Sequence, residues 1–140
     1  MPHTEAYLYQ DSIDDHRHMI FLISQPRSGS TLLQRILGSH DHVFTSGEGW
    51  LMLHPLYALR PHRVQTEFES VHAKTALREL LDMFAEKDTL FFEAVRRYAL
   101  TFYNRALKVY GKQRFLDKTP RYYLILEDLF RVFPDAQYVF

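Results

Sequence analysis

The residues best suited to chemistry form a short polar loop, Gln-Pro-Arg-Ser-Gly-Ser-Thr, which ends at Thr31. Arg27 supplies a forked cation, and Ser28, Ser30 and Thr31 supply short hydroxyl donors. Gly29 permits backbone conformations that are closed to other residues. At the start of a helix the first N–H groups have no partner within the helix, and the helix dipole adds partial positive charge there. The loop therefore predicts a binding site for an anion.

Two other interpretations of the loop stay open. The same residue types would also suit a polar turn that serves only solubility. The loop is not a Walker A sequence, because it lacks the lysine and the leading glycine of GxxxxGK[ST]. Chemistry with magnesium and ATP is thus under-supported, but a P-loop kinase or nucleotide hydrolase remains an alternative, with Asp117 as its candidate magnesium ligand.

The segments around the loop have the pattern of a strand, a tight turn and a helix. Residues 18–24 form a continuous apolar run, which is typical of a strand buried on both faces of a parallel sheet. Apolar residues then recur at helical spacing and predict a helix over residues 30–39. This pattern is the first half of a β-α-β unit.

The rest of the chain is predicted to be mostly helical. Further helices are expected over residues 76–84, 88–110 and 120–133, and further strands over residues 113–117 and 136–140. Asp88 and Thr119 are the expected N-caps, and Gly111 is the expected stop of the longest helix. Phe102 and Phe130 are expected on the buried faces of their helices.

These elements predict an α/β domain of three layers, with a parallel central sheet and a P-loop-like nucleotide site at the carboxyl ends of its strands. Residues 1–17 are polar and aperiodic and are expected to form a loosely held arm, with the domain over residues 18–140. The last predicted strand has nothing after it. We therefore expect the domain to be truncated at its C-terminus, as the front part of a longer protein.

Composition argues against several classes of function. The 140 residues include 17 Lys and Arg against 17 Asp and Glu, and this zero formal charge disfavours general nucleic-acid binding. The absence of cysteine excludes disulfides, thiolate metal sites and a cysteine nucleophile. No apolar run approaches the ~20 residues of a membrane span, and the N-terminus lacks the apolar block of a signal peptide. We expect a cytoplasmic protein without a membrane partner.

The segment Phe21–Leu33 resembles the 5′-phosphosulfate-binding loop of sulfotransferases, enzymes that use 3′-phosphoadenosine 5′-phosphosulfate (PAPS) as sulfuryl donor. Its Arg-Ser-Gly-Ser-Thr form is similar to the tyrosylprotein, carbohydrate and bacterial branches. The resemblance implies that Arg27 and residues 28–31 bind PAPS as co-substrate. It covers roughly the N-terminal half of a typical member and essentially all of this chain.

Three further landmarks follow in the order that the family has. Thr45–Trp50 resembles the segment that carries the catalytic base, a role that would fall to Glu48. Phe115–Pro120 resembles the segment whose lysine, here Lys118, stabilises the departing bridging oxygen. Leu129–Phe140 resembles the helix and strand that lead to the 3′-phosphate site, which we expect to lie beyond this sequence. By residue type alone, Glu48 would also suit a surface turn.

The histidines suggest two further possibilities. His40 and His42 are reserve candidates for the base if Glu48 faces away from the site. The pairs His16/His18 and His40/His42 could each chelate a metal from one face of a strand, but no third ligand stands out and we expect no metal site.

The acceptor of the sulfuryl group is expected to carry a hydroxyl or an amine, on a small molecule, a carbohydrate or a peptide. Trp50, His54 and Tyr57 follow the predicted base and are candidates to line its site. A homo-oligomer and a non-catalytic nucleotide-binding fragment also stay open.

Overall fold

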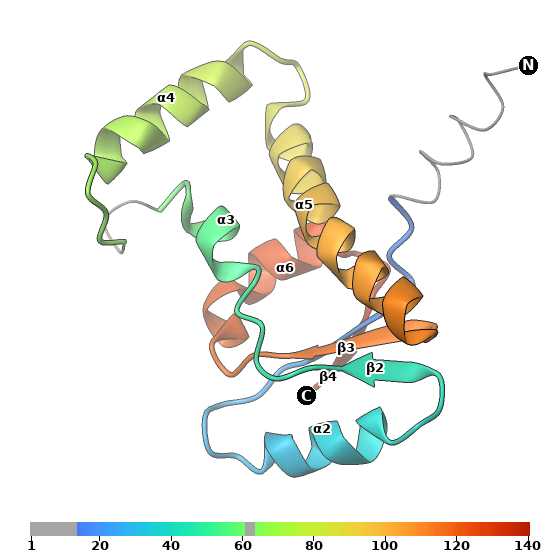
Figure 1. Ribbon diagram of the computed structural model, residues 1–140. Coiled ribbons are helices and arrows are strands. Elements are labelled where there is room, and N and C mark those ends of the chain that lie inside the picture. Colours follow the sequence, from blue (N-terminus) through green and yellow to red (C-terminus); the bar gives the residue numbers. More distant parts are fainter. Residues whose placement is uncertain (1–13, 61–63) are drawn as a thin grey trace, which may run out of the picture.

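The computed structural model describes residues 14–60 and 64–140 and has an α/β architecture (Figure 1). Its described strands are β1 (Met19–Leu22), β2 (Val43–Thr45), β3 (Arg114–Lys118) and β4 (Gln137–Val139). They form one sheet in the order β2-β3-β1-β4, and each pair of neighbours is parallel. Parallel pairing brings the carboxyl ends of these strands to one edge of the sheet.

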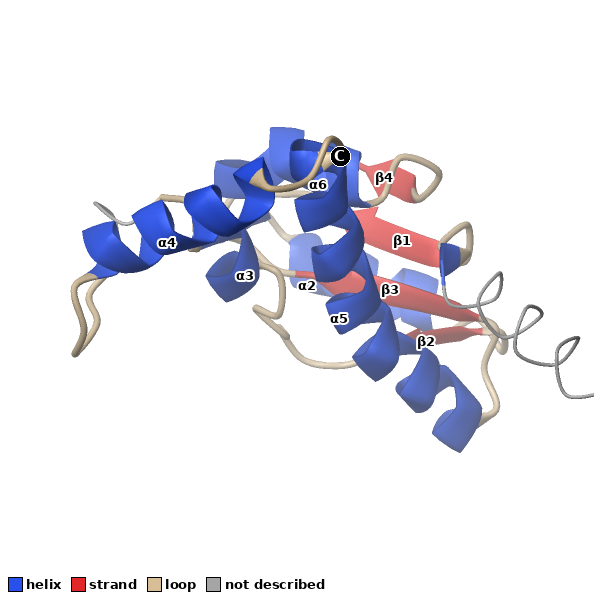
Figure 2. Ribbon diagram, turned by 90° about the horizontal axis from the view of Figure 1, so that it is seen from above, coloured by secondary structure: helices blue, strands red, loops and turns tan. Residues whose placement is uncertain are grey.

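Helices cover both faces of this sheet and make it the middle of three layers (Figures 1 and 2). Helix α2 (Ser30–Gly38) packs on one face, against β2 and β3. Helices α5 (Lys87–Tyr110) and α6 (Leu126–Val132) lie on the other. The predicted fold class is confirmed.

In the described part of the connection from β2 to the long helix α5 there are two helices. The short helix α3 (Leu53–Tyr57) contacts η2 (Tyr122–Ile125), a 3-10 helix that follows β3. Helix α4 (Ser70–Asp82) packs against α5 and extends away from the sheet (Figure 1).

The main hydrophobic core lies between the sheet and the layer of α5 and α6. Phe21 of β1 is fully buried, and its ring contacts the rings of Tyr122, Phe133 and Tyr138. Helix α5 adds a stripe of buried side chains at helical spacing: Phe91, Val95, Ala99, Leu100, Tyr103 and Leu107. Burial of this apolar surface is the main force that holds β1 and β3 in the centre of the sheet.

Most of the predicted elements are present, although α4 begins at Ser70 and not at residue 76 as predicted. The predicted helix over residues 30–39 is α2, and the longest predicted helix is α5, which begins one residue before Asp88 and has Glu86 as its N-cap residue. Gly111 follows α5 with φ 63°, in the left-handed region, and so ends the helix as predicted. Phe102 was predicted on the buried face of α5 but is 53% exposed.

Helix α2 buries the side of its surface that the sequence did not indicate. Its buried residues are Ser30 and Gln34, whereas Leu32 and Ile36 are 65% and 58% exposed. The apolar spacing correctly predicted a helix, but Gln34 is buried because its side-chain amide donates to Thr45 Oγ1 at the end of β2 and to the Ser46 carbonyl oxygen.

The prediction of a helix that starts at Pro120 with Thr119 as its N-cap is wrong. The chain instead forms η2 and then α6, and no side chain caps either helix. Thr119 does not cap because its hydroxyl donates to Asp117 and accepts from the Trp50 N–H. Phe130, predicted on the buried face, is 40% exposed.

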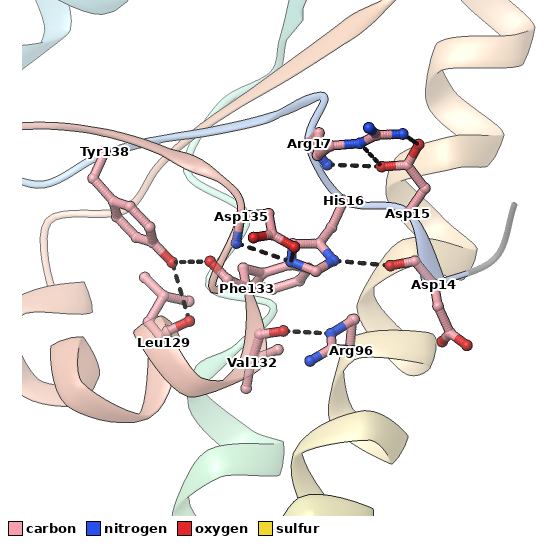
Figure 3. A network of polar contacts seen from close by, with 10 residues as sticks. All are labelled: Asp14, Asp15, His16, Arg17, Arg96, Leu129, Val132, Phe133, Asp135 and Tyr138. Atoms are coloured by element: carbon pink, nitrogen blue, oxygen red, sulfur yellow. Dashed lines mark hydrogen bonds and ion pairs between the residues drawn. The ribbon is translucent and has the colours of Figure 1, made fainter. Parts of the chain in front are cut away.

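The described part of the predicted N-terminal arm is held against the start of β4 (Figure 3). His16 is buried; its Nδ1 lies 2.8 Å from the Asp14 carbonyl oxygen, and its Nε2 accepts the Asp135 N–H at 3.1 Å. Because a carbonyl oxygen can only accept, the imidazole carries its proton on Nδ1. Residues 1–13 of the arm lie outside the described residues.

Candidate active site

The predicted anion loop turns sharply between β1 and α2. Arg27 and Gly29 both have positive φ, 61° and 83°, and Gly29 is the N-cap residue of α2. The Gly29 carbonyl oxygen accepts the N–H groups of Leu32 and Leu33. Within the part of the chain that the structure describes, no group accepts a hydrogen bond from the N–H groups of residues 27–31. The loop therefore has the form of an anion cradle at a helix N-terminus.

Lys118 reaches this loop from the end of β3. Its side chain is only 3% exposed, yet its Nζ donates to Glu48 Oε1 at 3.0 Å and to Thr31 Oγ1 at 3.3 Å. Leu22 pairs with Lys118 in the sheet, so the lysine stands where β1 turns into the anion loop. The ammonium group thereby joins the end of β3 to the segments that follow β1 and β2.

Glu48 faces the site, as predicted, from the segment after β2. The hydrogen bond from Lys118 holds the pKa of this carboxyl below its usual value, and a second hydrogen bond from the Trp50 indole, at 3.3 Å from Oε2, acts in the same direction. The Glu48 carboxyl is thus ionised at neutral pH and can accept a proton, as a general base must.

These residues surround an open cleft of about 460 Å³. Its lining comprises Pro26, Arg27, Gly29, Ser30, Thr31, Glu48, Trp50, Lys118, Pro120 and Arg121. Of the predicted site residues, Ser28 is the one outside this lining. The lining of the cleft therefore includes three cationic side chains (Arg27, Lys118 and Arg121), one carboxylate and the start of α2.

A second, more apolar hollow of about 480 Å³ adjoins the cleft and shares Trp50 and Arg121 with it. It also contains His54, Tyr57 and Leu124. The three side chains that the sequence suggested for an acceptor site, Trp50, His54 and Tyr57, thus line one hollow, and Trp50 also contacts Glu48.

Asp117 lies on the other side of the sheet from the cleft. Consecutive residues of a strand point to opposite faces, so Asp117 points toward α5 while Lys118 points toward α2. The Asp117 carboxylate is 3% exposed and accepts hydroxyl donors from Tyr103, Thr119 and Tyr122. In the kinase or hydrolase alternative, Asp117 was the candidate magnesium ligand, but its carboxylate does not face the cleft.

The histidines also lie away from the cleft. His40 and His42 are exposed in the turn between α2 and β2, and the His42 carbonyl oxygen accepts from Gln113 and Arg114 at the start of β3. This turn lies at the edge of the sheet where the strands begin, whereas Glu48 lies at the edge where they end, so neither histidine can replace Glu48 as the base. No three His, Asp or Glu side chains converge as metal ligands in the described ranges.

Sequence reasoning missed the side chains that hold the Glu48 segment in place. Gln34 donates to the Ser46 carbonyl oxygen at 2.7 Å and to Thr45 Oγ1 at 2.8 Å, and Thr119 and Tyr122 contact the segment from the other side. A glutamine among the leucines of α2 was the available indication of a buried polar contact. Nothing in the sequence indicated the role of Tyr122.

Comparison with known proteins agrees with this geometry. The model of the "Sulfotransferase family" matches residues 19–140. The chain is 30% identical over 119 residues to "Nodulation protein NoeE" of Sinorhizobium fredii (strain NBRC 101917 / NGR234), an alignment that covers 85% of this chain and 27% of that protein. The chain thus spans about a quarter of the length of this curated relative.

No solved structure matches the chain. None of the described helices is long and apolar enough to cross a membrane. The family match covers the anion loop, the glutamate after β2 and the lysine at the end of β3, which together line one cleft. The chain belongs to the sulfotransferase family.

Proposed function

We propose that this chain carries the donor-binding loop and the catalytic base of a PAPS-dependent sulfotransferase. The observation that supports this most is the position of Lys118, whose Nζ contacts both Thr31 of the anion loop and Glu48. Transfer of a sulfuryl group from a phosphosulfate to a hydroxyl calls for a cation, a carboxylate and free backbone N–H groups, and the cleft brings these together.

The residues of the cleft have separate parts in this reaction. Arg27 and the N–H groups of residues 28–31 bind the 5′-phosphosulfate, with the hydroxyls of Ser30 and Thr31 as additional donors. Glu48 takes the proton of the acceptor hydroxyl or amine as its oxygen or nitrogen bonds to sulfur. The bond from sulfur to the bridging oxygen breaks, its electron pair stays on that oxygen, and Lys118 stabilises the resulting charge. The products are the sulfated acceptor and adenosine 3′,5′-bisphosphate.

The hollow beside the cleft is the proposed acceptor site. It opens next to Glu48, and its aromatic and apolar lining suits the ring of a small molecule, a sugar or a peptide side chain. Trp50→Ala is expected to raise the KM for acceptors of any of these classes while the KM for PAPS stays unchanged. A parallel rise in both KM values would argue that Trp50 supports the donor site instead.

Titration calorimetry with adenosine 3′,5′-bisphosphate and with adenosine 5′-monophosphate tests the donor assignment. Because the 3′-phosphate site is expected to lie beyond this sequence, binding that requires the 3′-phosphate supports a sulfotransferase donor site that is completed by other residues, such as those of a partner chain. Equal binding of both nucleotides indicates a general anion loop, and the absence of binding indicates a non-catalytic relative. Binding of ATP that needs Mg²⁺ would favour the kinase or hydrolase alternative.

A further inference from the structure

A buried polar cluster lies directly behind the cleft, on the opposite face of β3. Its centre is Asp117, whose Oδ1 accepts the Thr119 hydroxyl at 3.0 Å and whose Oδ2 accepts the Tyr122 hydroxyl at 2.9 Å. Tyr103 of α5 donates its hydroxyl to the same Oδ2. Burial raises the pKa of Asp117, against the three hydrogen bonds. A buried carboxylate is costly, and none of the steps proposed above uses this one.

Because Thr119 and Tyr122 donate to Asp117, their hydroxyl oxygens can still accept hydrogen bonds. Each hydroxyl has one proton, and Thr119 and Tyr122 give theirs to Asp117. Their oxygens then accept backbone N–H groups from the segment that follows Glu48. The Trp50 N–H donates to Thr119 Oγ1 at 3.4 Å, and the Met52 N–H donates to the Tyr122 hydroxyl at 3.3 Å.

The same segment is anchored at its other end by α2. Gln34 donates to the Ser46 carbonyl oxygen and to Thr45 Oγ1, which in turn donates to the Leu116 carbonyl oxygen of β3 at 2.8 Å. Glu48 therefore lies in the short span between the anchors at Ser46 and Trp50. Gly47 and Gly49 flank Glu48, and a Cβ atom added at either position would meet open space. Neighbouring atoms therefore do not pack against the span at these two positions.

Trp50 links this backbone anchor to the carboxylate. Its φ of 54° lies in the left-handed region, which costs a non-glycine residue on the order of 1–2 kcal/mol. This conformation lets one residue use its N–H on Thr119 and its indole on Glu48 Oε2. Hydrogen bonds from a rigid neighbour are the kind of support that a strained backbone at a functional site requires.

We propose that Asp117 is a positioning residue that acts through Thr119 and Tyr122 to hold the Glu48–Met52 segment and so aim the Glu48 carboxylate into the cleft. The placement of the segment stands on contacts alone, whereas its consequence for turnover rests on the proposed function. Asp117 and Lys118, adjacent in sequence, thus serve the same site from opposite faces of β3.

The chain contains a single tryptophan, so Trp50 fluorescence reports on this segment without any assay of activity. Thr119→Val removes the oxygen that accepts the Trp50 N–H and keeps the side-chain shape. We expect lower fluorescence anisotropy and a higher acrylamide quenching constant, with the far-UV circular dichroism of the wild type. Thr119→Ser restores the hydroxyl and is expected to restore both values.

Two further variants complete the experiment. Thr101→Val, at an exposed hydroxyl that bonds to the Arg97 carbonyl oxygen of α5, is the matched control and should leave Trp50 unchanged. Tyr122→Phe removes the second acceptor and provides the test if Thr119→Val fails to fold. Trp50 fluorescence that stays at the wild-type value in a folded Thr119→Val or Tyr122→Phe variant, or that changes equally in Thr101→Val, overturns the proposal.

Turnover gives the second readout. For Thr119→Val we expect kcat to fall roughly ten- to hundredfold while the KM for PAPS stays within about twofold, because the base is misplaced and the donor loop is not. A loosened Trp50 with unchanged kcat would overturn the catalytic part. A wild-type chain without any sulfotransfer would count against the proposed function and leave the fluorescence test of the placement intact.

Discussion

Lys118 Nζ lies 3.0 Å from Oε1 of Glu48, although the lysine side chain is buried and the glutamate side chain is 39% exposed. The pair joins the end of β3 to the segment after β2 and stands at the mouth of the anion loop. It places a cation that can stabilise a leaving group beside a carboxylate that can take a proton from an attacking group. In the proposed reaction, Glu48 acts on the group that attacks the sulfur atom and Lys118 acts on the oxygen that leaves it.

Removal of the lysine charge should change the titration of Glu48. Lys118 is the main cause of the lowered pKa of Glu48, so in Lys118→Gln that pKa should rise toward its usual value. A depressed folded-state pKa stabilises the fold above the usual value, and this contribution is lost as the pH falls through the lowered value. In the variant the folded and unfolded pKa values of Glu48 should nearly coincide, so this contribution should shrink, and the carboxylate should take up its proton at a higher pH.

A pH titration of Trp50 fluorescence measures this, because the indole donates to the same carboxylate. Lys112→Gln is the control, since Lys112 bonds to the Asp41 carbonyl oxygen at the other edge of the sheet. An identical acid titration in wild type and Lys118→Gln would show that the ion pair does not govern Glu48.

Loss of the Glu48 carboxylate should affect rate and not donor binding. Glu48→Gln keeps the shape of the side chain but cannot take a proton, so kcat should fall by roughly 10²–10⁴-fold. The Kd for adenosine 3′,5′-bisphosphate should stay close to that of the wild type. Glu79→Gln, at an exposed position of α4, is the control. A wild-type rate in Glu48→Gln would remove Glu48 as the base.

Gly29 and Gly111 offer a matched pair for the anion loop. Both have positive φ, 83° and 63°, and an added Cβ would meet open space at each. Alanine at either position should cost on the order of 1 kcal/mol of unfolding free energy, from backbone strain alone. Only Gly29→Ala should also weaken nucleotide binding, because relief of the strain there turns the N–H groups of the cradle. Equal binding losses, measured by calorimetry, would contradict a specific role of the loop.

The sequence predicted the anion loop and its supports because they depend on neighbouring residues. A buried strand, a glycine turn and a helix follow one another within residues 19–38, so local rules suffice. The parallel sheet then brings Glu48 and Lys118 to the same edge. Both were found by resemblance to the family, and residue types alone would have left Glu48 as a surface turn.

The polar contacts behind the site depend on packing between distant segments. Tyr103 and Asp117 come from α5 and β3, and whether a tyrosine on a helical stripe uses its hydroxyl cannot be read from spacing. Thr119 had the local pattern of an N-cap, but Asp117 competes for its proton in the folded chain. The buried face of α2 was missed for a related reason, since the partners of Gln34 lie at the end of β2 and meet it only through tertiary packing.

The central claim is that Arg27 and the N–H groups of residues 28–31 bind a phosphosulfate, and calorimetric titration of PAPS into Arg27→Ala tests it most directly. Arg35→Ala, a charge change in the last turn of α2 and outside the cleft, is the control. Loss of a charged hydrogen bond predicts roughly ten- to hundredfold weaker binding for Arg27→Ala, and wild-type binding for Arg35→Ala. Equal affinity of wild type and Arg27→Ala for PAPS would contradict the claim.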